Sequence, residues 1–147
     1  LTTKLGECIE CDVTGHDLAV CTLVDKVSSS NIFKYNNTTI QIVDGTYDNV
    51  KKDNMIALKG FYHSGPGKII VEKTKLSGRT FTEFAVATYK SQDGDSGGLI
   101  FSPNTKRAVG IHIASGEIKV DGTFQKAGAF LPCSAIKWKY GTLPKNN

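Results

Sequence analysis

Short runs of alternating apolar and polar residues, separated by turn residues, cover most of the chain. A period of two is typical of half-buried β-strands, and helical periodicity is nearly absent. Turns are expected at 43–45, 64–67, 77–78 and 102–104, and one helix is expected over 134–140. The pattern predicts strands over residues 7–13, 18–23, 39–43, 55–62, 68–73, 80–89, 98–101, 108–114 and 127–132. We therefore expect an all-β protein with a short C-terminal helix.

The spacing of these strands favours antiparallel barrels or a sandwich. A chain of 147 residues with 39% apolar content forms one compact unit or two small, tightly packed sub-domains. The polar stretch 44–54 (DGTYDNVKKDN) interrupts the strand pattern and has the composition of a linker. We predict the remainder of a first barrel over 1–44, an inter-barrel linker over 45–54, and a complete second barrel with the terminal helix over 55–147.

Composition restricts the classes of partner. No apolar run approaches the roughly 18–20 residues of a membrane span, and no signal peptide is visible, so we expect no membrane segment in this chain. The net charge of +4 comes from lysines spread along the chain, which permits weak RNA binding without requiring it. We expect no cofactor.

Four cysteines are present, and two of them, Cys8 and Cys11, form a C-x-x-C pair. A zinc site normally needs a second pair of ligands at similar spacing, and none is seen. Strand cysteines in a reducing compartment are therefore the favoured interpretation, with zinc or redox chemistry as the alternative. We expect no metal site.

The pentapeptide Gly-Asp-Ser-Gly-Gly, residues 94–98, follows a turn-rich run and precedes an apolar strand. Its glycines let the backbone turn tightly, so that amide N–H groups point to one place beside the hydroxyl of Ser96. An acyl-transfer transition state needs such donors, because negative charge develops on the substrate carbonyl oxygen. The pentapeptide resembles the nucleophile motif of chymotrypsin-like serine proteases. The resemblance implies Ser96 as nucleophile and the N–H groups of Gly94, Asp95 and Ser96 as oxyanion hole; the alternative is a polar β-turn.

A second segment, residues 17–23 (DLAVCTL), places an aspartate directly before an apolar run. It resembles the segment that carries the triad acid in the same family. The resemblance implies that Asp17 orients an imidazole and stabilises its charged form. The alternative is a turn or capping aspartate before a strand.

The general base is harder to place, because it must come within about 3 Å of the serine hydroxyl. In the family this histidine precedes the acid. We expect His63, in a turn, to be an exposed loop imidazole. A base at His16, with Asp25 or Asp44 as the acid, is the less favoured alternative, because too few residues precede it to form the usual strands. The favoured hypothesis places the catalytic histidine before Leu1, on an N-terminal segment or fragment.

His112 lies on an apolar strand, sixteen residues after Ser96. Ser91 lies five residues before Ser96. This spacing narrows the resemblance to the 3C-like main proteases of positive-strand RNA viruses, such as those of picornaviruses, arteriviruses and sobemoviruses. It implies that Ser91, His112 and Ser115 form the S1 pocket. A neutral imidazole N–H with hydroxyls suits a Gln or Glu side chain at P1, without burial of an unpaired charge. The alternative is a core histidine satisfied by a structural partner.

The same resemblance implies that Ile113, Ala114 and Gly116 pair with the substrate backbone as an added strand. The expected function is that of an endopeptidase that cuts viral polyprotein peptides in the cytoplasm of an infected host cell. Ser96 is either native to a serine-type enzyme or a replacement for cysteine. Two rivals remain: an inactive barrel that binds peptide or RNA, and a non-viral trypsin-like protease with paired disulfides.

Overall fold

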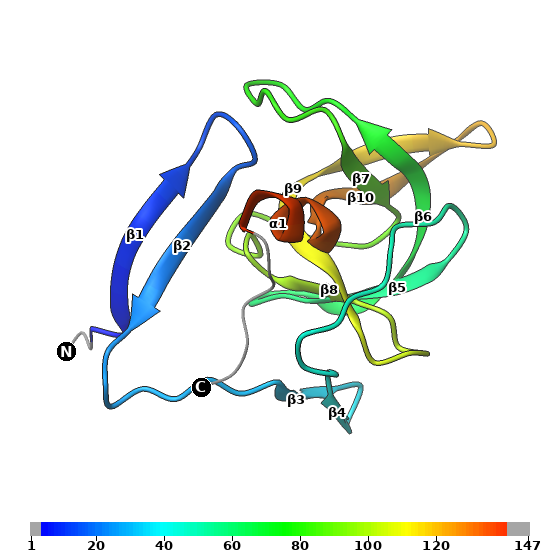
Figure 1. Ribbon diagram of the computed structural model, residues 1–147. Helices are drawn as coiled ribbons and strands as arrows, with labels where there is room; N and C mark the ends of the chain where they lie inside the picture. The colour runs from blue at the N-terminus through cyan, green and yellow to red at the C-terminus, as the bar shows by residue number, and fades with distance from the viewer. Residues whose placement is uncertain (1–3, 141–147) are drawn as a thin grey trace.

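The computed structural model describes residues 4–140 of the chain, and within that range strands predominate and helix appears only at the C-terminal end (Figure 1). The elements in chain order are β1 (Gly6–Asp12), β2 (Leu18–Leu23), β3 (Ile32–Tyr35), β4 (Thr38–Gln41), β5 (Met55–Lys59), β6 (Ser64–Thr74), β7 (Phe84–Ala87), β8 (Leu99–Phe101), β9 (Ala108–Val120), β10 (Thr123–Pro132) and α1 (Cys133–Tyr140). The predicted all-β class with a short C-terminal helix is confirmed.

Strands β5 to β10 close into a barrel in the order β10-β7-β6-β5-β8-β9, with antiparallel neighbours throughout. Apolar side chains from all six strands meet inside it, including Ile56, Leu58, Ile69, Ile100 and Phe130. Burying each such side chain contributes about 1.5–3 kcal/mol relative to exposure. The barrel is therefore a rigid support for the loops that connect its strands.

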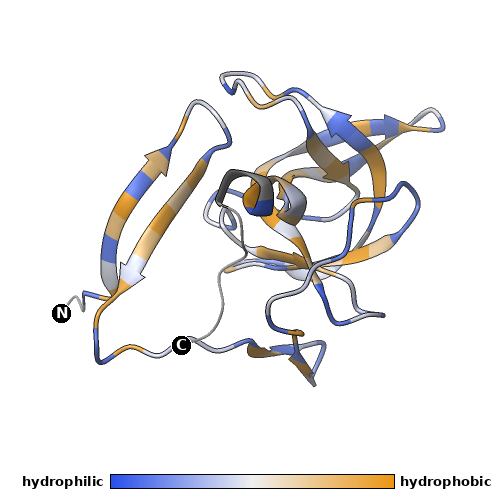
Figure 2. Cartoon of the chain, in the orientation of Figure 1, coloured by the Kyte–Doolittle hydropathy of each residue, from blue (hydrophilic) through white to orange (hydrophobic). Residues whose placement is uncertain are grey.

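Before residue 45, the described part of the chain contains two separate two-stranded sheets, β1-β2 and β3-β4. The β1-β2 hairpin stands beside the barrel, on the side where α1 lies (Figure 1). Hydrophobic residues occur along both of its strands (Figure 2), and Ile9 and Leu23 are exposed. A groove of about 630 Å³ runs between β2, α1 and the barrel, lined mainly by apolar residues such as Leu18, Val20, Phe33, Leu99, Ile111 and Ile136.

Residues 45–54, the predicted linker, are tied to the second barrel by backbone contacts. Tyr47 forms an isolated bridge with Ala108, and the N–H of Asp48 donates to the carbonyl of Ala108 at 2.9 Å. Just before this stretch, the N–H of Val43 donates to the carbonyl of Lys106 at 2.8 Å. The predicted domain boundaries remain a prediction, but this connection is not a free tether.

The turn predicted at 64–67 is wrong, because these residues begin β6. Gly65 pairs with Leu58 and Gly67 pairs with Ile56 across the β5-β6 ladder. Gly67 is needed for packing, since a Cβ there would lie 2.1 Å from the carbonyl oxygen of Thr88. The chain instead turns at residues 60–63, the last part of the strand predicted over 55–62.

Two hairpin turns were missed by the sequence pattern. Asn36 and Asn37 have φ of 49° and 62° and join β3 to β4, and Asp121 and Gly122 have φ of 50° and 82° and join β9 to β10. Two successive left-handed residues are typical of type I′ turns, which suit the twist of hairpin strands. The flanking strand ends are largely exposed, so they lack the apolar alternation used for prediction.

Within residues 4–140, no helix combines the length and apolar character that crossing a membrane requires.

Candidate active site

The loop that carries Ser96 connects β7 to β8 and is fastened at several points. Two glycines, Gly94 and Gly97, take left-handed φ values of 97° and 87°, which other residues rarely adopt. The N–H of Gly97 donates to the carbonyl of His112 at 2.9 Å, and the N–H of His112 donates to the carbonyl of Gly98 at 2.9 Å. The loop is thereby joined to β9, and Ser96 stays exposed at its outer side.

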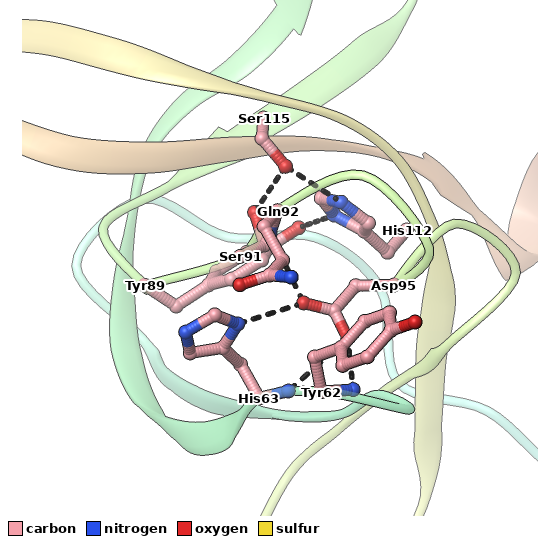
Figure 3. Close-up of polar contacts among 8 residues, drawn as sticks. All are labelled: Tyr62, His63, Tyr89, Ser91, Gln92, Asp95, His112 and Ser115. Carbon is pink, nitrogen blue, oxygen red and sulfur yellow. Dashed lines mark hydrogen bonds and ion pairs between the residues drawn. The ribbon is translucent and has the colours of Figure 1, made fainter.

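Asp95 points inward from this loop and is only 1% exposed. Its Oδ1 accepts the backbone N–H groups of Tyr62 (2.6 Å) and His63 (3.1 Å). Its Oδ2 accepts the N–H of Gln92 (3.0 Å) and lies 2.9 Å from Nδ1 of His63 (Figure 3). Burial acts to raise the pKa of Asp95, but the hydrogen bonds from Tyr62, His63 and Gln92 outweigh it and lower the pKa to about 2.

The protein is expected to lose stability between about pH 4 and pH 2 because of Asp95. The folded pKa, about 2, lies below the ordinary carboxyl value, so the ionised group stabilises the fold above pH 4 and this contribution disappears as the pH falls through 2. The contribution is about 2 kcal/mol. Urea unfolding at pH 5 and pH 2.5 measures it. The Asp95→Asn variant should lose less between the two pH values, and equal losses would contradict the assignment.

Two of the three predicted oxyanion donors are free. Among the hydrogen bonds of the described residues, the backbone N–H groups of Gly94 and Ser96 donate to no protein atom. The N–H of Asp95 donates to the carbonyl of Gln92 at 3.0 Å, so the prediction that it also serves as a donor does not fit this arrangement. The Ser96 hydroxyl donates to the carbonyl of Ile113 at 3.3 Å.

The three residues predicted to form S1 are brought together by hydrogen bonds (Figure 3). The hydroxyls of Ser91 and Ser115 lie 2.6 Å apart, and that of Ser115 lies 3.3 Å from Nε2 of His112. The other ring nitrogen, Nδ1, lies 2.7 Å from the hydroxyl of Tyr89. Tyr89 packs closely against Gly128, where a Cβ would lie 2.3 Å from the phenol ring. A line of polar groups thus runs from the barrel interior to the surface.

The imidazole of His112 is held in its neutral form. The side chain is 1% exposed, and burial lowers its pKa, while the nearby Asp95 carboxylate acts weakly in the opposite direction. Burial also raises the pKa of Tyr89 far above the physiological range, so its phenol keeps its proton. A neutral imidazole with a protonated phenol on one nitrogen is a hydrogen-bonding group without charge.

The edge of β9 beyond Ile111 is open on one side. Ala114 and Gly116 pair with β10 through Ala129 and Ala127. On the opposite side, the pairing of β9 with β8 extends only from Ala108 to Ile111. In the predicted substrate strand, the carbonyl of Ile113 accepts the Ser96 hydroxyl, and beyond it Ala114 and Gly116 have no strand partner on that side, so an extended peptide can add there.

Asp17 lies at the end of the β1-β2 turn with a left-handed φ of 57°. One of its oxygens accepts the Nε–H of Arg79 at 3.0 Å, and no imidazole contacts it among the described residues. The next residue, Leu18, packs against the apolar cluster that contains Ile113, whose carbonyl accepts the Ser96 hydroxyl. Asp17 is thus held by Arg79, and among the described residues no hydrogen bond joins it to Ser96 or to a histidine.

His16 is paired with a different acid from those predicted. Its Nδ1 lies 2.9 Å from Asp12, and its ring stacks on Phe81 at 4.4 Å between centroids. Its Nε2 is buried without a hydrogen-bond partner. The alternative acids Asp25 and Asp44 are thus not its partners, and its ring does not contact Ser96. The carbonyls of Thr14 and Gly15 accept the N–H groups of Thr80 and Phe81, which keeps His16 beside the β6-β7 loop.

Three residues of this region escaped sequence reasoning: His63, Arg79 and Tyr89. His63 was predicted to be an exposed loop imidazole; it does lie in a turn, but it is only partly exposed, and it donates to the buried carboxylate of Asp95. The partners are separated by 32, 62 and 23 positions in the chain, respectively. No local pattern marks such pairs, although a buried Asp beside the serine does require a donor from somewhere.

The cysteines carry free thiols. Cys8, Cys11 and Cys21 are exposed on the β1-β2 hairpin, while Cys133 is buried at the start of α1, where burial raises its pKa to about 12. Across residues 4–140, no group of three or more His, Cys, Asp or Glu side chains is arranged to hold a metal ion.

Solved structures with a similar fold are serine proteases. A glutamic-acid-specific serine protease superposes with a TM-score of 0.76 at 20% identity, over 94% of this chain and 72% of that one. The fold is that of the chymotrypsin-like serine proteases. Thermobifida fusca Protease A (TM-score 0.76, 15% identity, 97% of this chain and 75% of that one) and Cellulomonas bogoriensis chymotrypsin (0.76, 16%, 97% and 76%) are similar in the same way. No protein-family model and no curated protein sequence gives a significant match.

The chymotrypsin-like fold accounts for the arrangement of the two halves of the chain. The closed barrel β5–β10 is the complete second barrel, and the β1-β2 and β3-β4 sheets are the partial first barrel. The predicted fold class is confirmed. Since the identities are 20% or lower, the likeness establishes architecture and leaves the chemistry of the site to its own residues.

Proposed function

We propose that this chain is the nucleophile-bearing part of a serine endopeptidase that processes a viral polyprotein by cleavage after Gln or Glu. The observation that carries the proposal is the hydrogen-bonded line from Tyr89 through His112 to Ser115 and Ser91, next to the Ser96 loop. The spacing of these residues resembles that of the 3C-like proteases, which supports the viral assignment. Such an enzyme would act in the cytoplasm of an infected host cell.

In the proposed mechanism the Ser96 hydroxyl attacks the backbone carbonyl carbon of the P1 residue, and its proton passes to a histidine base. The free N–H groups of Gly94 and Ser96 stabilise the oxyanion. The tetrahedral intermediate then expels the amine, which takes the proton back from the base. Water, activated by the same histidine, cleaves the acyl-enzyme and restores the serine.

P1 selection follows from the protonation of the line. If the phenol of Tyr89 donates to Nδ1 of His112, the single ring proton of a neutral imidazole lies on Nε2. That N–H, with the hydroxyls of Ser91 and Ser115, presents donors to the side-chain oxygen of Gln or Glu. A lysine or arginine at P1 would meet no carboxylate in this line, so its charge would stay unpaired.

The base is proposed to come from a segment that carries a histidine in addition to the three in this chain. His16 is bound to Asp12, His63 to Asp95, and His112 to Tyr89. Among the described residues, no imidazole is hydrogen-bonded to the Ser96 hydroxyl, which donates to the carbonyl of Ile113. The apolar groove of about 630 Å³ between the β1-β2 hairpin and the barrel supports this proposal, because further strands of a first barrel would fill such a space. Asp17 would then orient the incoming imidazole.

The rival function is a barrel that binds a peptide without cleaving it. The lack, among the described residues, of an imidazole bound to the Ser96 hydroxyl favours this rival. Labelling the parent polypeptide with a fluorophosphonate distinguishes the enzyme from the binding module, because an enzyme gives an adduct on Ser96. Absence of both the adduct and peptide cleavage would favour the binding module.

The glutamic-acid-specific neighbour is described as using a histidine triad in substrate binding. In this chain a single histidine, His112, is joined by Tyr89 and two serines.

Replacing His112 with alanine is expected to remove cleavage after Gln and Glu while Ser96 still reacts with the fluorophosphonate. The substitution deletes the proposed P1 donor, and loss of a buried hydrogen-bonding group costs about 10²–10⁴ in discrimination. The measurement is kcat/KM on peptides that differ only at P1 (Gln, Glu, Arg and Phe). Asp121→Ala, in the exposed β9-β10 turn, is the control. Unchanged turnover after Gln in His112→Ala would refute the pocket.

A further inference from the structure

We propose that His63 is a positioning residue for the oxyanion hole, acting through the Asp95 carboxylate; this inference rests on the proposed protease function. His63 lies in the turn between β5 and β6, on a different part of the barrel from the nucleophile loop. Its Nδ1 lies 2.9 Å from Oδ2 of Asp95, the residue directly before Ser96 (Figure 3). The contact therefore joins a rigid hairpin to the reactive loop.

The 60–63 turn is shaped to enclose this carboxylate. The N–H of Gly60 donates to the carbonyl of His63 at 2.9 Å, which closes the turn. Two successive N–H groups, of Tyr62 and His63, then point to the same oxygen of Asp95. Gly60 leaves room for it, since a Cβ there would lie 2.7 Å from Oδ1. On the other side, the Tyr62 ring covers Gly94, where a Cβ would meet the ring at 2.4 Å.

The direction of the Asp95 side chain fixes the direction of the peptide groups around it. With the carboxylate held inside, the N–H of Asp95 donates to Gln92 and its carbonyl accepts the N–H of Gly98. The peptide unit that follows carries the N–H of Ser96, which is left free on the outer side of the loop. Because a misplacement of about 1 Å in a reacting geometry costs about a hundredfold in rate, the fixation of Asp95 bears directly on catalysis.

His63 provides the side-chain hydrogen bond to the Asp95 carboxylate. The other three donors to Asp95 are backbone N–H groups, which persist in any variant that folds. The side chain of His63 is 35% exposed while that of Asp95 is fully buried, so truncation of His63 opens a path for water to Oδ2. The hydroxyl of Ser96 donates to Ile113, so His63 does not act as its base in this arrangement.

The test uses ¹⁵N-labelled protein and two peptides that end in Gln, one as an aldehyde and one as a primary amide. The aldehyde forms a hemiacetal with Ser96 whose oxygen enters the oxyanion hole, whereas the amide uses S1 alone. His63→Ala should weaken aldehyde binding about tenfold to a hundredfold and leave amide binding within about twofold. It should also shift the amide resonances of Gly94 and Ser96. His63→Asn, which keeps a donor near Oδ2, should recover most of the loss.

Phe61→Leu is the matched control, because Phe61 lies in the same turn, its side chain is exposed, and it donates no hydrogen bond to Asp95. Equal weakening of both peptides in His63→Ala, or no change in either the binding or the Gly94 and Ser96 resonances, would overturn the role of His63. A wild-type protein that binds the aldehyde no better than the amide would overturn the proposed function instead. In that case the resonance shifts alone still decide whether His63 positions the loop.

Discussion

Ser96→Ala is expected to abolish covalent labelling by a fluorophosphonate and to reduce peptide cleavage about 10⁶-fold. The reason is that the exposed hydroxyl is the group beside the free N–H groups of Gly94 and Ser96, and removing a nucleophile removes the acyl-enzyme route altogether. The labelled chain is measured by mass spectrometry. The kcat is measured with a Gln-containing peptide as substrate and the parent polypeptide as enzyme. Folding should be intact, because the hydroxyl makes one weak bond, to Ile113 at 3.3 Å.

Two further variants make this result interpretable. Ser91→Ala removes the neighbouring hydroxyl of the S1 line and should change the P1 preference while Ser96 is still labelled. Ser96→Cys should react with thiol reagents at this position, and its rate of peptide cleavage relative to the wild type tests whether serine is native here. Full labelling of Ser96→Ala at any other serine would contradict the nucleophile assignment.

Asp95→Ala is expected to lower the free energy of unfolding by about 3–5 kcal/mol, the largest stability effect that we expect in this region. The substitution leaves four donors directed at an empty site: the N–H groups of residues 62, 63 and 92, and Nδ1 of His63. Each buried donor without a partner costs about 1–3 kcal/mol, partly relieved where water enters beside His63. Urea unfolding near pH 7 measures the change.

The matched control is Asp93→Ala, two residues away in the same loop and exposed. It should change stability by no more than about 0.5 kcal/mol, as is usual for surface positions. Asp95→Asn should fall between the two, since the amide keeps one acceptor oxygen but turns donors toward donors. A loss in Asp95→Ala no greater than that in Asp93→Ala would show that the buried carboxylate does not hold the loop.

The second barrel was largely predictable from the chain, because its strands are short apolar runs bounded by turn residues. The buried runs of β5, β8 and β10 supply Ile56, Leu58, Ile100 and Phe130 to the barrel core. Prediction failed where glycine, a typical turn residue, lies within a strand instead. Gly65 and Gly67 were assigned to a turn, yet they lie in β6 because the backbone of Thr88 approaches too closely for a side chain. Polar hairpin ends were missed because solvent on both faces removes the alternation.

In the candidate site too, local sequence indicated some residues, whereas others became apparent only in the structure. Ser91, Ser96, His112 and Ser115 were singled out from short spacings; in the structure Ser91, Ser115 and His112 are joined by hydrogen bonds, and the Ser96 hydroxyl donates to Ile113, the residue after His112. Asp17 was assigned from its segment, but its partner in the structure is Arg79, which comes from the β6-β7 loop. His63 was set aside because a histidine in a turn is usually solvated. Its importance depends on the depth of Asp95, and burial of that kind has no signature in the neighbouring residues.

The sequence by itself therefore determined the strand class, the helix at the end, and the presence of a serine on a glycine-rich turn. These follow from local periodicity and from backbone freedom, which act over a few residues. Only the tertiary structure decided which side chains hold that turn. Closure of the barrel brings His63 to Asp95 across 32 positions and Tyr89 to His112 across 23. Such pairs form because a buried polar group must find its partner in space, wherever that partner lies along the chain.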